Sequence, residues 1–340
     1  MLVFAVRRIV TAVMLLLLLT LITFVIFYRI PAEPGRILVG EKAPMSKVRE
    51  ANHKLGADRP LPEQYGMFLW RLVRGDLGVT WDTVGDPQGE QHVRPLLLDS
   101  AGVTASVLIG GVVLLILIAV PLGSLAALRE GTPLDRLSTV AVIACVSLPP
   151  AVVGLLLKTF VARELGLAPQ DGYCNLVPHG VELCGGFHDW AAHLILPWLT
   201  FALFFGALYM GMTRTRMINE LGQPYVRTAR AKGAGELRVV GRHALRNAIL
   251  PLVTMLAMDV GTALGISVYV ETVFGLPGLG SLWLHSLGGQ IGGFDLPVIL
   301  GLVVFTGLIV IVANLAVDLL YGVIDPRVRE AGSVRATLVR

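Results

Sequence analysis

The sequence VTASVLIGGVVLLILIAVPLGSLAAL, residues 103–128, contains no charged side chain. A helix of about 20 apolar residues spans the roughly 30 Å hydrocarbon core of a bilayer, so this run is long enough to cross a membrane. Further charge-free runs of similar length occupy residues 9–28, 138–157, 194–213 and 296–317. A sixth run, 251–270, is interrupted only by Asp259. The sequence therefore predicts an all-α polytopic membrane protein with six transmembrane helices.

The composition and the first run support this class. Of the 340 residues, 54% are hydrophobic and 15% are charged, whereas soluble domains carry about 25% charged residues. Arg7 and Arg8 precede the first run, as in a secretory signal peptide. A signal core has only about 7–15 apolar residues, however, so we expect this longer run to be retained as a membrane anchor.

Basic residues are concentrated in alternate connections between the runs. They precede the first run and follow the second, fourth and sixth, at Arg7, Arg8, Arg129, Arg136, Arg214, Arg216, Arg227, Arg230, Lys232, Arg238, Arg242, Arg246, Arg327, Arg329, Arg335 and Arg340. Cytoplasmic loops of membrane proteins carry an excess of lysine and arginine, so we expect both termini in the cytoplasm, N-in and C-in. The net charge of +4 follows from this topology. We expect contact with membrane lipid and no nucleic-acid partner.

These runs divide the chain into four predicted segments. They are an N-terminal transmembrane helix (1–30), a large extracytoplasmic segment after it (31–102), a five-helix core (103–325) with a cytoplasmic loop (214–250), and a cytoplasmic tail (326–340). Within the extracytoplasmic segment, apolar residues recur at helical spacing over 63–74. This spacing predicts an amphipathic helix that lies on the membrane surface or on the helix bundle.

Cys174 and Cys184 share the predicted extracytoplasmic connection between the third and fourth runs. Two cysteines ten residues apart in an oxidising compartment favour a disulfide. Free thiols are one alternative. A metal site is another, because His179, His188 and His193 are near in the sequence, but such a site needs about four converging ligands. We expect the disulfide and no metal.

The connection after the fourth run contains YVRTARAKGAGELRVVGRHALRNAILP, residues 225–251. Its first part begins after a proline and ends at a glycine, which is typical of a short helix, and helical spacing resumes after Gly235. Arg238, Arg242 and Arg246 then recur on one helical face. A parallel apolar stripe consists of Leu237, Val240, Ala244 and Ala248. The segment is therefore predicted to be two helices joined by a Gly-Ala-Gly turn.

A basic helical corner of this kind has two explanations. Arginines can anchor it at anionic lipid head groups, or the corner can dock into a groove on a soluble partner. Lipid anchoring accounts for the arginines but not for the glycines, whose lack of side chains suits the close approach of another backbone.

Several stretches together resemble one family. YVRTARAKG (225–233) and RHALRNAILP (242–251) resemble the EAA motif, the cytoplasmic loop of binding-protein-dependent ABC importer permeases, in the form found in the dipeptide, oligopeptide and nickel branch. Four more resemble signatures of that branch, namely RRIVTAVMLLLLLTLITFVIFYRIP (7–31), RGDLG (74–78), ETVFGLPGLG (271–280) and NLAVDLLYGVIDPRVR (314–329). The resemblance covers nearly the whole chain and is strongest to the DppB/OppB-like permease subunit.

The resemblance implies an ABC importer permease fold, in which 103–325 is the permease core and 214–250 the coupling loop. In this family the glycine corner is a coupling helix that fits a cleft in an ATPase subunit. Carried over, the ATPase-coupling residues are Arg227, Arg230, Lys232, Gly233, Ala234, Gly235, Glu236 and Leu237. Gly233 is the motif glycine, and the four residues after it form the contact tip.

The resemblance also implies the partners and the location. The partners are a second homologous permease subunit, two ATPase subunits and an extracytoplasmic substrate-binding protein, and the chain is a multi-pass protein of the bacterial inner membrane. The sequence has no phosphate-binding glycine loop followed by Lys and Ser or Thr, and no GxSxG motif. We expect no catalytic residue and no cofactor in this chain, with ATP and magnesium bound by the partner ATPase subunits.

Two acidic residues are candidates for the translocation pathway. Asp259 is the only acid well inside a predicted span, and intramembrane charges tend to face cavities, so we expect it to line the pathway. The alternative for Asp259 is a structural hydrogen bond to a neighbouring helix. Glu271 ends the same span, and its position in the family suggests an outer gate or a helix-end contact.

The predicted function is therefore a transmembrane permease subunit of an ATP-driven importer for di- or oligopeptides or a related solute. The resemblance leaves the solute open among dipeptides, longer peptides, nickel chelates and haem. The alternative is a self-sufficient secondary transporter of small solutes. Such transporters usually have inverted repeats and unwound helices at mid-membrane, and neither is visible in the sequence. A membrane-embedded enzyme would need a nucleophile or metal ligands inside the spans.

Overall fold

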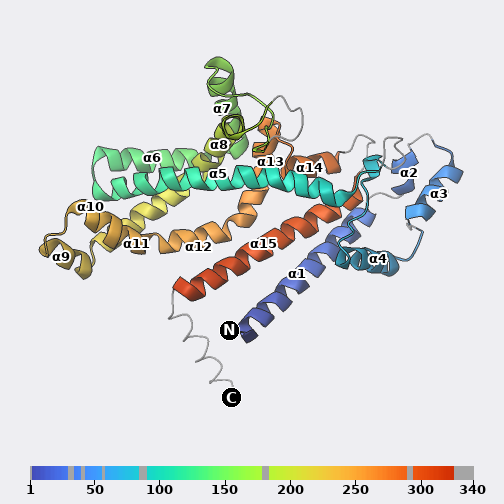
Figure 1. Ribbon diagram of the computed structural model, residues 1–340, viewed down its shortest axis with the longest axis horizontal. Helices are drawn as coiled ribbons and strands as arrows, with labels where there is room; N and C mark the ends of the chain where they lie inside the picture. Colours follow the sequence, from blue (N-terminus) through green and yellow to red (C-terminus); the bar gives the residue numbers. More distant parts are fainter. Residues whose placement is uncertain are drawn as a thin grey trace. The chain divides into compact units, whose positions relative to one another are not determined.

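The computed structural model describes residues 2–29, 34–39, 43–55, 58–83, 90–177, 184–288 and 294–324. The regular structure of these residues is helical, as predicted, with two isolated β-bridges (Figure 1). The chain divides into two compact units. Unit 1 contains Met1–Gly102 and Gly278–Ala313, and unit 2 contains Val103–Pro277 and Asn314–Arg340.

Unit 1 holds the amino-terminal helices and two helices from the carboxy-terminal part. They are α1 (Leu2–Arg29), α2 (Pro34–Val39), α3 (Met45–Leu55), α4 (Leu61–Val73), the short 3-10 helix η1 (Trp81–Thr83), the first turns of α5 (Val93–Leu128), α14 (Leu279–Leu287) and most of α15 (Leu296–Ile324).

Unit 2 holds the remaining helices. They are the rest of α5, α6 (Pro133–Ser147), α7 (Pro150–Leu157), the π-helical segment η2 (Lys158–Glu164), α8 (Phe187–Leu221), α9 (Pro224–Ala231), α10 (Glu236–Arg238), the π-helical segment η3 (Val239–Ala244), α11 (Leu245–Ala248), α12 (Leu250–Met258), α13 (Val260–Phe274) and the end of α15.

Four helices of the described residues, α1, α5, α8 and α15, are long and apolar enough to cross a membrane. The bent pair α12 and α13 makes five if it counts as one span. The predicted third span, 138–157, is wrong as a single helix, since α6 ends at Ser147 and α7 begins at Pro150. Pro149 and Pro150 lack the backbone N–H groups that would continue the helix. Six spans and the N-in/C-in orientation stay predictions.

In unit 1, α4 packs on α1 and α15. The rings of Tyr65 and Phe68 lie 5.5 and 6.2 Å from the ring of Phe24 on α1, and the same cluster includes residues of α15. The helix stops before Gly75, whose φ of 73° only glycine adopts readily. The helix predicted over 63–74 is therefore confirmed. Its face that carries Tyr65 and Phe68 packs on α1 and α15.

A buried aspartate joins the segment after α4 to the start of α15. Asp295 is only 3% exposed. Its Oδ2 accepts hydrogen bonds from the Thr80 hydroxyl and from the Trp81 backbone N–H at 3.1 Å, and its Oδ1 accepts one from the Val298 N–H at 3.3 Å. Because buried carboxylates are costly without such donors, these bonds hold η1 against the first turn of α15.

In unit 2, α5 and α8 approach each other at glycines. A Cβ atom on Gly110 would lie 2.0 Å from the Trp198 ring, and one on Gly123 would lie 2.7 Å from the Met210 carbonyl oxygen. Trp198 Nε1 also donates to the Ser106 carbonyl at 2.9 Å. Small residues allow the backbones of membrane helices to approach closely, so these glycines set the spacing of the two helices.

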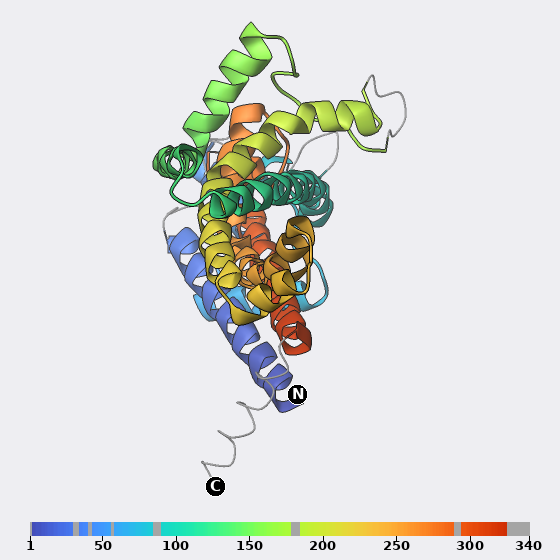
Figure 2. The same cartoon turned by 90° about the vertical axis from the view of Figure 1, so that its left-hand side faces the viewer.

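α8 lies between two connecting segments of unit 2. The loop that carries the two cysteines precedes it, and the corner formed by α9 and α10 follows it. Its 35 residues correspond to about 52 Å of helix, which exceeds a hydrocarbon core of about 30 Å. Figures 1 and 2 show the corner and α7, which lies beside this loop, well apart within unit 2.

Candidate functional site

The predicted glycine turn lies between α9 and α10. α9 ends in a turn where the Gly233 N–H donates to the Arg230 carbonyl at 2.9 Å and the Ala234 N–H donates to the Ala229 carbonyl at 3.1 Å. Gly233 has a φ of 79°, which disfavours any other residue. The chain then extends through Gly235 and re-enters helix at α10. We call residues 224–238 the corner.

An ion pair bridges the corner across its turn. Arg230 Nη2 donates to Glu236 Oε1 at 2.6 Å, and Arg230 Nε donates to Oε2 at 3.2 Å. The hydrogen bonds from Arg230 hold the pKa of the Glu236 carboxyl below its ordinary value. Both side chains are exposed, so the pair contributes little to global stability, but it links α9 directly to α10.

The base of the corner is fixed by Tyr225. Its hydroxyl donates to the Glu220 carboxylate, at the end of α8. The same hydroxyl accepts a hydrogen bond from Asn247 Nδ2 at 3.0 Å. One side chain of α9 therefore connects α8 to α11, a connection that no sequence pattern indicated.

Leu237 is the most exposed apolar residue of the corner, at 92%. The predicted stripe placed it with Ala244 and Ala248, which are buried at 0% and 1% against α5 and α8. That prediction is wrong for Leu237, and Val239 is the buried residue near it. The π-helical turn of η3 has more residues per turn than an α-helix, so side chains at α-helical spacing do not keep one face.

The eight predicted coupling residues all lie in this corner, and the structure brings them together. All are exposed except Ala234, which is partly exposed. Arg227, Arg230 and Lys232 come from the α9 side of the turn, and Glu236 and Leu237 come from α10. The corner therefore presents cations beside one projecting aliphatic side chain.

A second ion pair, not predicted, lies near the end of α8 that leads to the corner. Arg214 of α8 donates from Nε and Nη2 to the two carboxylate oxygens of Asp135, at 2.5 and 2.8 Å. The Gly131 N–H also donates to Asp135 at 3.0 Å. The hydrogen bonds from Arg214, followed by that from Gly131, lower the pKa of Asp135 from 3.8 to about 2.

Asp259 lies where α12 ends and α13 begins, and the two helices are bent by 57° at this point. The hydroxyl of Tyr209, on α8, donates to Asp259 Oδ2 at 2.8 Å. Tyr209 is 3% exposed, whereas Asp259 is partly exposed. The structure thus contains the interhelical hydrogen bond named as the alternative role, beside a carboxylate that stays accessible.

Glu271 is fully buried, at 0% exposure, near the other end of α13. Its Oε1 accepts a hydrogen bond from the Thr104 hydroxyl of α5 at 2.7 Å. Asp259 and Glu271 are twelve residues apart on one helix, or about 18 Å along its axis, so the fold does not bring them together.

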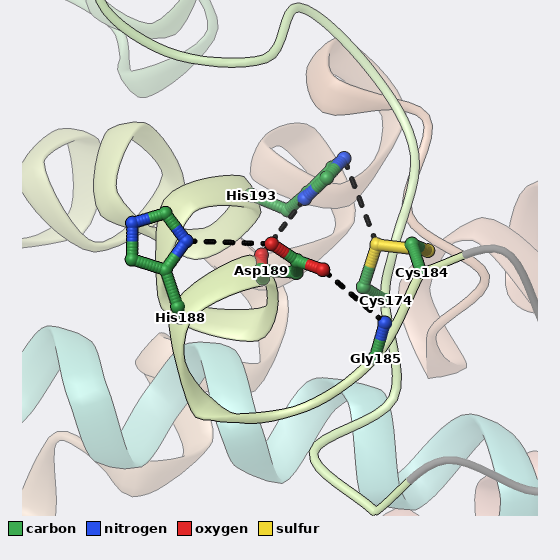
Figure 3. Close-up of a disulfide and its surroundings, with 6 residues drawn as sticks. All are labelled: Cys174, Cys184, Gly185, His188, Asp189 and His193. Carbon is green, nitrogen blue, oxygen red and sulfur yellow. Dashed lines mark hydrogen bonds and ion pairs between the residues drawn. A yellow bond between two sulfur atoms is a disulfide. The ribbon is translucent and has the colours of Figure 1, made fainter.

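Cys174 and Cys184 are joined by a disulfide, with their Cα atoms 5.6 Å apart (Figure 3). His193 lies beside the disulfide, with Nε2 3.8 Å from the Cys174 sulfur, and its Nδ1–H donates to the Asp189 carbonyl at 2.8 Å. His188 contacts the carboxylate of Asp189 instead. His179 lies outside the described residues. In the part of the chain that is described, no three His, Cys, Asp or Glu residues are grouped to hold a metal ion.

The loop before the disulfide is tied to the end of α13. The Gly172 N–H donates to the Phe274 carbonyl at 3.2 Å. Lys158 Nζ donates to the Val273 carbonyl at 2.7 Å and pairs with Asp171. A cation at a helix carboxy terminus is favourable because free carbonyls carry partial negative charge there, so Lys158 holds the loop against α13.

Two family models match this chain. The family model described as binding-protein-dependent transport system inner membrane component matches residues 119–330. The model of the N-terminal part of such membrane components matches residues 1–88. Together they contain the corner, both acidic candidates and the disulfide.

Full-length relatives have the same type of name. The dipeptide transport system permease protein DppB of Escherichia coli (strain K12) is 34% identical over 348 residues, covering 97% of this chain and 99% of that protein. The oligopeptide transport system permease protein AppB of Bacillus subtilis (strain 168) is 32% identical, covering 96% and 98%. The di/tripeptide transport system permease protein DppB of Pseudomonas aeruginosa (strain UCBPP-PA14) is 34% identical, covering 91% and 94%. With a family model over more than half of its length and such relatives over nearly all of it, this chain belongs to the family of binding-protein-dependent transport system inner membrane components.

Proposed function

We propose that this chain is the transmembrane permease subunit of an ATP-driven importer of di- or oligopeptides, and that it forms half of the translocation pathway. Family membership and the names of the full-length relatives support the transport role. The observation that carries the coupling role is the corner, a braced helical turn with Leu237 exposed at its tip.

The corner has the properties of a docking element. An aliphatic side chain that is 92% exposed is well suited to enter an apolar pocket of a partner. Gly235 has a φ of −62°, and a Cβ atom there would meet no atom within 4 Å. The fold of this chain therefore does not require a glycine at 235, whereas the close approach of another protein would.

The proposed partners follow from this role. Two ATPase subunits bind ATP and magnesium and contact the corners of two permease subunits, this chain and a homologous one. An extracytoplasmic binding protein delivers the solute. ATP-driven closure of the ATPase pair moves the corners, and rigid-body motion of the helices converts this into alternating access.

The proposed topology has six crossings in the bacterial inner membrane, with both termini in the cytoplasm. The basic connections after 128 and after 213 share one side only if two crossings separate them. α8 supplies one crossing, and α6 with α7 supplies the other as a broken span. Asp259 lines the pathway, and Glu271 acts at its outer gate.

The coupling role is tested by Gly235→Arg and Leu237→Asp in the complex assembled from all subunits. Both variants should insert into the membrane normally, because neither position is enclosed by this chain. Co-purification of the ATPase subunits and stimulated ATP hydrolysis should each fall at least about tenfold, as for the loss of an interface anchor. The matched control is Leu167→Asp, at a 74% exposed leucine in the loop before α8, which should retain the ATPase subunits. Normal recovery of the ATPase with both corner variants would contradict the coupling role.

One observation favours the alternative, a self-sufficient secondary transporter. The bent pair α12 and α13 places a carboxylate at a helix break, which is a feature of such transporters. The two functions differ in their energy source. Purified chain alone in vesicles should move no dipeptide down an ion gradient, and uptake under that condition would favour the alternative.

A further inference from the structure

The Asp259 side chain does not cap α13, although the residue stands at the start of that helix. An aspartate at a helix start usually accepts a hydrogen bond from a backbone N–H of the first turn. The Asp259 side chain makes no such bond. Its Oδ2 accepts from the Tyr209 hydroxyl at 2.8 Å instead, which turns the carboxylate toward α8.

The described residues around the Asp259 carboxylate satisfy only part of its hydrogen-bonding capacity. An ionised carboxylate offers about four acceptor sites, and Tyr209 occupies one of them. No Lys, Arg or His of the described residues forms an ion pair with Asp259. A charge within an otherwise apolar span is costly unless it is paired or reaches water, and this side chain is partly exposed.

The surroundings favour a cation over an anion. The carboxy-terminal end of α12, which carries partial negative charge, points at the same break. Beside Tyr209, α5, α8 and α12 line an apolar crevice in which Tyr209 is the one residue with a polar side chain. Asp259 itself does not line this crevice, but Tyr209 contributes to the crevice wall and donates to Asp259. An apolar surface and an oriented acceptor therefore share one residue, which suits an ammonium group attached to a small apolar body.

We propose that Asp259, oriented by Tyr209, is a binding station for the protonated amino group of the peptide as it passes through the membrane. This inference rests on the proposed import function. A zwitterionic peptide carries one ammonium and one carboxylate, and the Asp259 charge attracts the first and repels the second. The amino group, and not the carboxyl group, therefore pairs with α13 at this level.

The experiment uses the complete reconstituted importer, its binding protein and a radiolabelled zwitterionic dipeptide that the binding protein retains. Three variants separate charge from hydrogen bonding. Asp259→Asn keeps an acceptor for Tyr209 but removes the charge, Asp259→Glu keeps the charge, and Tyr209→Phe removes only the hydroxyl. The measured quantity is peptide delivered per ATP hydrolysed.

The expected loss for Asp259→Asn is about tenfold in peptide delivered per ATP, the factor typical of a lost charge-assisted hydrogen bond. ATP hydrolysis stimulated by the loaded binding protein should persist. Asp259→Glu should retain at least about half of the wild-type delivery. Tyr209→Phe should lose no more than about threefold, since the carboxylate charge that attracts the amino group is kept and only its orientation is loosened.

Four outcomes would overturn the station. They are normal delivery by Asp259→Asn, equal losses for Asp259→Asn and Tyr209→Phe, a proportional fall in ATP hydrolysis, and a wild-type requirement for Na⁺ or K⁺ that Asp259→Asn abolishes. Equal losses would mean that Asp259 serves only to join α13 to α8 through its hydrogen bond with Tyr209. The ion requirement would mean that an inorganic cation, and not the peptide amino group, binds at Asp259. Absence of ATP-driven uptake by the wild-type importer would instead contradict the proposed function.

Discussion

Asp135, in the first turn of α6, joins that helix to α8 within unit 2. Its carboxylate is held by two nitrogens of Arg214 and by the Gly131 N–H. This arrangement fixes the first turn of α6 to α8, two turns before α8 ends and the corner begins. A bidentate Arg–carboxylate pair is both strong and fixed in its geometry. This contact therefore holds α6 against the part of α8 that leads into the corner.

The pH dependence of stability tests this contact. The pKa of Asp135 is about 2 in the folded protein, against an ordinary value of 3.8, so the folded state binds the proton less tightly. Its contribution to stability is complete above pH 3.8 and is lost as the pH falls toward 2, with about half remaining at pH 3. Asp135→Asn should lower the melting temperature in detergent by roughly 2–4 °C at pH 7, and the difference from wild type should shrink by pH 3.

The control for this measurement is Asp99→Asn, at an exposed carboxylate of α5, which should match wild type throughout. A difference between Asp135→Asn and wild type that stays constant from pH 7 to pH 3 would mean that the carboxylate charge is not the stabilising feature.

At the scale of elements, the crossing of α5 and α8 depends on glycines, and at Gly123 the missing side chain leaves room for backbone. A Cβ atom at Gly123 would lie 2.7 Å from the Met210 carbonyl oxygen and 2.8 Å from Thr213 Cβ. The first of these atoms belongs to the backbone, so it cannot move aside without moving α8. The helix pair therefore has little room for adjustment at this point.

Gly123→Ala should destabilise the chain by about 1–3 kcal/mol, the usual cost of overpacking. The matched control is Gly211→Ala on α8, where a Cβ atom meets nothing within 4 Å. That substitution should be neutral or stabilise the helix by up to about 1 kcal/mol. Denaturation in detergent compares the two, and equal stability of both variants would show that α5 and α8 can separate at no cost.

At the scale of the whole molecule, the length of α8 sets the distance between the disulfide loop and the corner. The disulfide loop precedes it and the corner follows it. Its 35 residues, about 52 Å of helix, exceed the hydrocarbon core, so the two ends fall on opposite sides of the membrane in the proposed topology.

Leu167→Cys and Leu237→Cys place single reporters at these two ends, at positions 74% and 92% exposed. With the chain expressed without its ATPase subunits, a membrane-impermeant maleimide should label Cys at 167 and not at 237 in intact cells. Inside-out vesicles should reverse the pattern, and wild-type chain gives the background. Labelling of position 237 from outside would invert the proposed orientation.

Features that depend only on neighbouring residues could be predicted from the sequence. Runs without charge reached the length of a bilayer, and α1, α5, α8 and α15 formed there. Gly233 required a left-handed backbone, so the helical corner was predictable from a few adjacent residues. Local patterns predicted wrongly at 138–157, where the helix breaks at Pro149 and Pro150 inside one apolar run, and at Leu237, where a π-helical turn changed the face.

The contacts between polar groups, by contrast, follow from how the helices pack against one another. Asp135 pairs with Arg214 across 79 residues of sequence, Tyr209 meets Asp259 across 50, and Thr104 meets Glu271 across 167. Hydrophobicity determines that a helix is buried in the membrane, but it does not determine how the helix is rotated or which neighbour it faces. Those choices come from side-chain packing between helices, as at the glycines of α5, and they depend on all the helices together.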